Sequence, residues 1–199
     1  FPTRRSSDLI GSTRIYLLLE QIREIYKNIP SAFKMNDLQI VFANWSHGSS
    51  LKTMIRISTD PQYNNRPMLL LIQSIPGEVF GTYLSQNIRL TDRDQFIGDT
   101  STFVFTLEPT VGVYPASGIN TNFFMCNSKC IQIGLSEKGN AIYIDEDLNQ
   151  GWSDPCDTFG NPPLVHTQVS HNNQLGESSP VDKRPTKFSI AYIELYVLV

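Results

Sequence analysis

Apolar and β-branched residues recur along this chain in short runs, and turn residues separate one run from the next. In the run TFVFTLE, Phe103, Phe105 and Leu107 occupy alternate positions, so a strand would place them on one face. The pattern predicts strands at 38–43, 68–74, 79–84, 102–107, 122–126, 130–134, 141–145 and 188–199. Many short strands with few helices between them favour a mostly β (α+β) fold, namely a two-sheet antiparallel β-sandwich with a few peripheral helices.

The three-and-four spacing of a helix face occurs near the start of the chain. Ile15, Ile22, Ile25 and other apolar residues follow this spacing, which predicts an amphipathic helix over about 14–29. Pro30 ends it, because proline supplies no N–H and disfavours helical geometry in the residue before it.

A second, shorter helix is expected at 50–57. Ser46 or Ser49 is the expected acceptor for an unpaired N–H of its first turn. Gly48 allows the chain to turn into this helix, because glycine tolerates backbone conformations that other residues avoid.

Composition narrows the classes of function. The 199 residues, 40% hydrophobic and 18% charged, suffice for one domain with a sizeable core. The net charge of −3 and the lack of a Lys/Arg-rich stretch argue against nucleic acid as a partner. No apolar run approaches the ~20 residues of a membrane-spanning helix. The cysteines, Cys126, Cys130 and Cys156, are too few for a disulfide scaffold and favour a reducing, cytoplasmic location.

The expected domain covers 10–199, with one unrelated segment before it and one long loop within it. Residues 1–9, FPTRRSSDL, match the translation of a sequencing-adapter string and are interpreted as an artefact, so that the chain begins inside a longer protein. Residues 165–187 are polar, lack periodicity, and are expected to form a long loop.

The stretch GWSDPCDTFGNPPL, followed by His166, contains the residue types of a thiol hydrolase or a peroxide scavenger. Cys156 would be the nucleophile or redox thiol, His166 its base, and Asp154 or Asp157 the orienting group. Thiol hydrolases, however, usually have partners far apart in the sequence. We therefore favour a structural interpretation, in which Cys156 packs as a small hydrophobic residue beside Phe159.

Metal and nucleotide sites find little support in the sequence. Cys126-x3-Cys130 with Cys156 and a histidine has the ligand types of a zinc site, but structural zinc sites usually show two such closely spaced pairs and only one is present. The segment 145–151 places its glycine one position too late for a calcium loop. No glycine-rich phosphate loop occurs. We expect neither a metal nor a cofactor.

Five ordered blocks of the sequence resemble those of the TLDc domain: WSHGSSLKTMIR, MLLLIQSIPGEVFGTYLS, FIGDTSTFVFTLEP, AIYIDEDLNQGWSDPCDTFGNPPL and FSIAYIELYVLV. The resemblance is strongest to the C-terminal TLDc domain of the TBC/TLDc proteins of the Skywalker type, and extends to oxidation-resistance proteins. It implies a β-sandwich without an established catalytic centre, a part in oxidative-stress resistance or vesicle trafficking, and binding to the vacuolar proton pump (V-ATPase). It also implies an upstream TBC domain acting on a Rab GTPase, and recruitment to vesicle or endolysosomal membranes.

The same resemblance marks Gly48, Gly81, Gly134 and Glu194 as family-characteristic positions. The glycines have a structural explanation in positive φ or close backbone approach. For Glu194 a structural and a binding role weigh about equally, because a carboxyl group in the apolar strand YIELYVLV needs partners to be buried. Tyr196 stands where the family usually has tryptophan.

Overall fold

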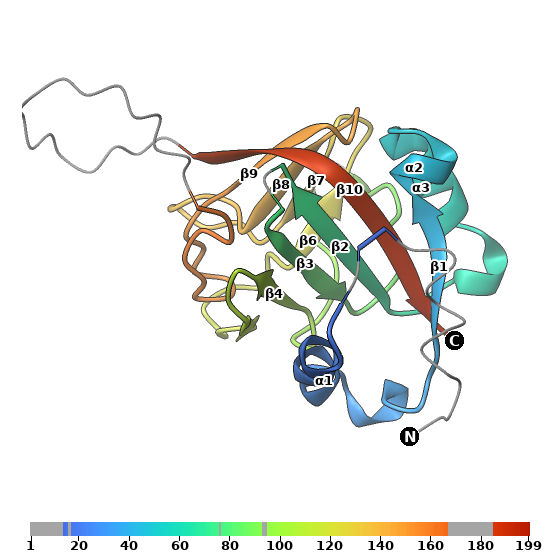
Figure 1. Ribbon diagram of the computed structural model, residues 1–199, viewed down its shortest axis with the longest axis horizontal. Helices are drawn as coiled ribbons and strands as arrows, with labels where there is room; N and C mark the ends of the chain where they lie inside the picture. The colour runs from blue at the N-terminus through green and yellow to red at the C-terminus, as the bar shows by residue number, and fades with distance from the viewer. Residues whose placement is uncertain (1–13, 16, 76, 93–94, 167–184) are drawn as a thin grey trace, which may run out of the picture.

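The computed structural model describes residues 14–15, 17–75, 77–92, 95–166 and 185–199 (Figure 1). Its helices are α1 (Leu19–Asn28), α2 (Asn44–His47) and α3 (Leu51–Ser58), with 3-10 turns at Ser31–Phe33 and Pro61–Tyr63. Its strands are β1 (Leu38–Ala43), β2 (Met68–Ser74), β3 (Val79–Leu84), β4 (Phe103–Glu108), β5 (Gly112–Pro115), β6 (Phe124–Cys126), β7 (Cys130–Ile133), β8 (Ile142–Asp145), β9 (Gln150–Ser153) and β10 (Thr186–Leu198).

All described strand pairs are antiparallel and form two sheets that share β10. Sheet A has the order β5-β4-β3-β2-β10-β1, and sheet B has the order β10-β9-β8-β7-β6. The first four residues of β10, Thr186 to Ser189, pair with β9, whereas Ile190 and Tyr192 to Leu198 pair with β1 or β2. Figure 1 shows β10 crossing the whole molecule as its longest strand. The predicted two-sheet antiparallel sandwich is thus confirmed.

The main core fills the space between the two sheets. Sheet A contributes Leu70, Ile72 and Phe80, and sheet B contributes Ile131 and Ile144. Helix α3 closes one end of this core with the buried side chains of Leu51 and Met54. Burial of such large apolar side chains is the main source of stability for a two-layer fold.

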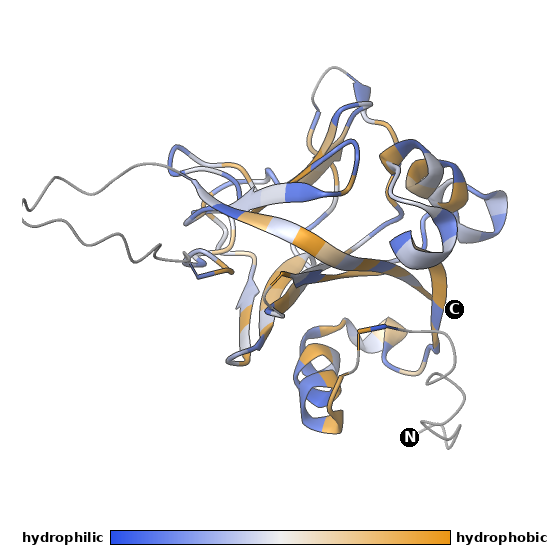
Figure 2. Ribbon diagram, turned by 45° about the horizontal axis from the view of Figure 1, so that its top comes forward, coloured by the Kyte–Doolittle hydropathy of each residue, from blue (hydrophilic) through white to orange (hydrophobic). Residues whose placement is uncertain are grey.

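A second core lies on the opposite face of sheet A, where α1 packs against the sheet. Phe103, Phe105 and Leu107 point into it, as their alternation predicts, and Ile25 and Ile29 cover them from the helix side. Their neighbour Val104 belongs instead to the core between the sheets. Figure 2 shows α1 on one side of sheet A and the α2–α3 region on the other. Strand β4 is therefore buried on both faces.

The two expected helices form, with shifted starts. Helix α1 begins at Leu19 rather than near residue 14, because the backbone N–H of Ile15 is directed to the side chain of Glu194 instead of into a helical turn. It ends at Asn28, two residues before Pro30, as expected. Helix α3 begins at Leu51, and its first turn is capped by Ser50, whose Oγ accepts from the N–H of Thr53 at 3.4 Å. The cap is therefore neither Ser46 nor Ser49.

The eight expected strands are present, three with the expected bounds and five with ends shifted by one or two residues, and two more strands occur that the pattern missed. These are β5 and β9, each four residues long, with the sequences GVYP and QGWS. Of the expected polar loop 165–187, Val165 is buried and Thr186 and Lys187 belong to β10. Residues 167–184 of that loop, and the adapter-like residues 1–9, lie outside the described residues.

Candidate functional site

Glu194 lies on β10, next to the edge strand β1 of sheet A. Strand β10 runs there between β1 and β2, so Glu194 is opposite Ala43 on one side and Leu71 on the other. Its side chain is 0% exposed in the described structure. A carboxyl group in this position is costly unless hydrogen-bond donors surround it.

Among the described residues, four donors from three separated parts of the chain meet the carboxyl group of Glu194. Oε1 accepts from the backbone N–H groups of Arg14 at 2.6 Å and Ile15 at 3.4 Å, and from the indole Nε1–H of Trp45 at 3.1 Å. Oε2 accepts from the hydroxyl of Tyr196 at 2.7 Å. Glu194 thereby joins the segment before α1, helix α2 and the last strand.

Trp45 extends from this buried carboxyl group to the surface. Its indole N–H is held by Glu194, while 39% of the residue remains exposed. The guanidinium carbon of Arg14 lies 5.6 Å from the centroid of the Trp45 ring, within the range of a cation–π contact. The chain thus presents an aromatic–cation pair whose orientation depends on Glu194.

The family-characteristic glycines Gly48 and Gly81 have different structural reasons. Gly48 ends α2 with φ of 79°, and nothing lies within 4 Å of where a Cβ would be. At Gly81 on β3 a Cβ would lie 2.0 Å from the carbonyl oxygen of Leu70 and 2.9 Å from the ring of Phe105. Glycine is favoured at position 48 because of the positive φ there. At position 81 it is required because the neighbouring strand leaves no room for a Cβ.

Gly134 lies directly against Cys156. Its φ is 67°, and a Cβ there would lie 2.9 Å from the Cys156 sulfur and 3.0 Å from the ring of Phe159. Phe159, Leu164 and Cys156 all belong to the core between the sheets. The loop containing Cys156 therefore folds inward and seals one end of the sandwich.

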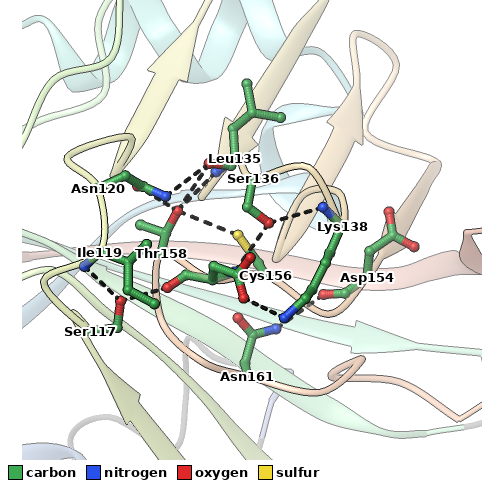
Figure 3. Close-up of polar contacts among 11 residues, drawn as sticks. Ser117, Ile119, Asn120, Leu135, Ser136, Lys138, Asp154, Cys156, Thr158 and Asn161 are labelled. Atoms are coloured by element: carbon green, nitrogen blue, oxygen red, sulfur yellow. Dashed lines mark hydrogen bonds and ion pairs between the residues drawn. The ribbon is translucent and has the colours of Figure 1, made fainter.

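Figure 3 shows polar groups around Cys156 that connect its loop to neighbouring loops. Its thiol donates to the hydroxyl oxygen of Thr158 at 3.4 Å, and that hydroxyl in turn donates to Asn120 Oδ1 at 2.9 Å. Asp157 forms an ion pair with Lys138 at 2.6 Å, on the outside of the same turn. Cys156 itself is 1% exposed.

The candidate partners of Cys156 are engaged elsewhere. The Nδ1 of His166 lies 2.7 Å from Glu78 Oε1, at the turn between β2 and β3, and its ring is largely exposed. Asp154 lies against Gly139, and burial raises the pKa of its carboxyl group. The described contacts therefore do not bring Cys156, His166 and an aspartate together as a nucleophile, base and orienting group.

The other candidate metal ligands also have structural positions. Cys126 points into the core between the sheets, and burial, helped by the nearby Cys130, raises the pKa of its thiol to about 12. Asp145 Oδ1 accepts from the backbone N–H groups of Asn149 and Gln150, as in a polar turn between β8 and β9. Among the described residues, no group of three or more His, Cys, Asp or Glu side chains is placed to hold a metal ion.

The residues that sequence reasoning missed are Arg14 and Trp45. Arg14 lies outside the five family-like blocks and Trp45 only begins one of them, and they are separated from Glu194 by 180 and 149 positions. The sequence did show a carboxyl group within an apolar strand. Such a group needs hydrogen-bond donors when buried, but the sequence does not identify which residues supply them.

Comparisons with known proteins agree with this structure. The family model described as the TLDc domain matches residues 11–199. Human oxidation resistance protein 1 is 33% identical over 148 residues, which is 74% of this chain and 16% of that protein. The Drosophila melanogaster GTPase-activating protein skywalker is 33% identical over 153 residues, 68% of this chain and 25% of that protein. Chicken nuclear receptor coactivator 7 is 29% identical over 143 residues, 72% of this chain and 15% of that protein.

The chain spans a quarter or less of the length of these three relatives. Its identity to the oxidation-resistance protein and to skywalker is the same, so identity does not separate the two branches. None of the described helices is long and apolar enough to cross a membrane. The match along residues 11–199, together with the sandwich and the buried glutamate of its last strand, shows that this chain belongs to the TLDc domain family.

Proposed function

We propose that this chain is a non-catalytic interaction module of an oxidative-stress-resistance or vesicle-trafficking protein, and that it binds subunits of the V-ATPase from the cytoplasmic side of vesicle or endolysosomal membranes. The names of the relatives, oxidation resistance protein 1 and the GTPase-activating protein skywalker, support the two settings. The family resemblance supports the proton pump as the partner.

The observation that carries this proposal is the exposed pair of Trp45 and Arg14. Tryptophan and arginine are enriched among the residues that dominate binding energy at protein interfaces. Here their relative position is fixed, because Glu194 accepts a hydrogen bond from the indole of Trp45 and another from the backbone of Arg14. A preorganised aromatic–cation pair loses little conformational freedom on binding.

In this proposal Glu194 is a positioning residue, since it is buried and does not reach a partner itself. Its role is to fix two parts of the chain beside β10, namely the segment before α1 and helix α2. A TBC domain elsewhere in the full protein would supply the contact with a Rab GTPase, and the TLDc chain would bring that activity to a pump-bearing membrane.

The test is retention of V-ATPase subunits from a vesicle-membrane extract by the immobilised 199-residue chain. The chain is expected to retain them, and Trp45→Ala is expected to lose most of this retention. Ile119→Ala is the matched control, because Ile119 is a 70% exposed apolar residue on the loop between β5 and β6. Circular dichroism confirms that each variant is folded. Retention by Trp45→Ala equal to that of the control, or no retention by the unchanged chain, contradicts the proposal.

A further inference from the structure

Strand β5 ends sheet A with an open edge. Among the described strands it pairs with β4 alone. In an antiparallel sheet, half of the backbone N–H and C=O groups of such a strand point away from its only neighbour. An open edge of this kind can accept a further strand through main-chain hydrogen bonds.

A cleft of ≈ 540 Å³ lies where α1 passes this edge. Its lining residues are Glu20, Glu24 and Asn28 from α1, and Val111, Gly112 and Val113 at the start of β5. The helix residues are four positions apart, so they form one row along the helix surface. The cleft therefore has a polar helical wall facing the backbone of a strand.

The charged side chains that line the cleft, Glu20 and Glu24, are both acidic. Val111, 47% exposed, adds an apolar surface at the same place. Lys27 forms an ion pair with Glu24 on the exposed side of α1. Exposed ion pairs contribute little free energy, so a basic group of a ligand can displace Lys27 from Glu24 at low cost.

The spacing of the two carboxyl groups suits an extended peptide. Residues four apart on a helix differ by about 6 Å along its axis. Alternate residues of a strand lie about 6.8 Å apart on one face. Where an added strand runs along α1, basic side chains at its alternate positions match the spacing of Glu20 and Glu24, while the positions between them face the other way.

We infer that this cleft binds an extended basic segment of another protein, which adds to sheet A beside β5 and places alternate Lys or Arg side chains against Glu20 and Glu24. This site is separate from the Trp45–Arg14 surface and does not depend on binding to the V-ATPase. The open edge supplies the affinity, and the acidic helix row supplies the selection for positive charge.

The test uses two fluorescent eight-residue peptides, one in which Lys alternates with Val and one in which Glu replaces each Lys. Anisotropy is expected to show binding of the basic peptide alone. The double variant Glu20→Gln/Glu24→Gln should weaken that binding about fivefold, the sum expected of two exposed ion pairs. The matched control is Glu137→Gln/Glu146→Gln, which removes the same charge from exposed positions elsewhere.

Amide hydrogen exchange then locates the bound peptide. Slower exchange at the amides of β5 in the presence of the basic peptide is the expected result. Three outcomes overturn the inference: equal binding of both peptides, equal weakening by the two double variants, or binding without protection of β5. Dimerisation of the chain alone through β5, detected by sedimentation and by protection without peptide, also overturns it, because the occupant would then be a second copy.

Discussion

The backbone of Gly134 leaves room for the sulfur of Cys156, and a Cβ at Gly134 would lie 2.9 Å from that sulfur. This contact connects two positions, a family-characteristic glycine and the candidate thiol, that are 22 residues apart in sequence. Because the same Cβ would also meet Phe159, neighbouring side chains offer it no alternative space.

Gly134→Ala is expected to lower the free energy of unfolding by about 2–3 kcal/mol, through positive-φ strain and crowding together. Gly160→Ala is the matched control, because Gly160 has φ of 63° but nothing within 4 Å of its added Cβ. The control should cost only about 1–2 kcal/mol, the strain alone. Urea denaturation measures the free energy of unfolding of both variants. Equal decreases in Gly134→Ala and Gly160→Ala would show that the contact with Cys156 does not affect stability.

Replacing Glu194 by Leu is expected to cost about 3 kcal/mol or more, because buried N–H and O–H donors lose their acceptor. Trp45→Phe removes a single one of these donors and should cost about 1 kcal/mol. In a double-mutant cycle, the effect of Trp45→Phe should largely disappear in the Glu194→Leu background. Additive losses in chemical denaturation would contradict the hydrogen bond between the two side chains.

Peroxide consumption should be the same for the unchanged chain and for Cys156→Ser. A thiol reacts as its thiolate and must be reached by the oxidant, whereas Cys156 is 1% exposed. Labelling by a thiol reagent should likewise be slow in the folded chain and rapid after denaturation. A clear loss of peroxide consumption in Cys156→Ser would instead support the thiol-dependent enzyme that the sequence left open.

Stability should fall above pH 9 because of Cys126. Burial raises the pKa of its thiol from the ordinary 9.0 to about 12. The folded chain therefore keeps a proton that the unfolded chain releases between these values, and unfolding becomes easier as the pH rises. From pH 8 to pH 10 the free energy of unfolding should drop by about 1.4 kcal/mol more in the unchanged chain than in Cys126→Ala. Parallel pH dependence in both would contradict a buried, protonated thiol.

The sequence predicted the architecture well because strand periodicity and turn residues are local signals. Phe103, Phe105 and Leu107 share a face as expected, although that face is covered by α1 and not by the second sheet. Strands β5 and β9 were missed because their glycine, proline and polar residues carry little strand propensity, and pairing with neighbours determines their conformation.

The candidate site was predictable only in part. The buried carboxyl group of Glu194 was noticeable as an exception within an apolar strand. Its donors were not, because Arg14 and Trp45 reach it only after β1 and β10 pair. The proximity of Gly134 and Cys156 likewise depends on how two loops close the end of the sandwich.

Strand β10 gives this chain an all-or-none character. It is the shared member of both sheets and the neighbour of β1, β2 and β9, whose residues are drawn from widely separated parts of the sequence. Until it is in place, sheet A has a gap between β1 and β2, sheet B lacks the strand beside β9, and the apolar faces of both sheets remain exposed to water. During synthesis, therefore, neither sheet can be completed before β10 has been made. We expect neither sheet to fold as an independent unit.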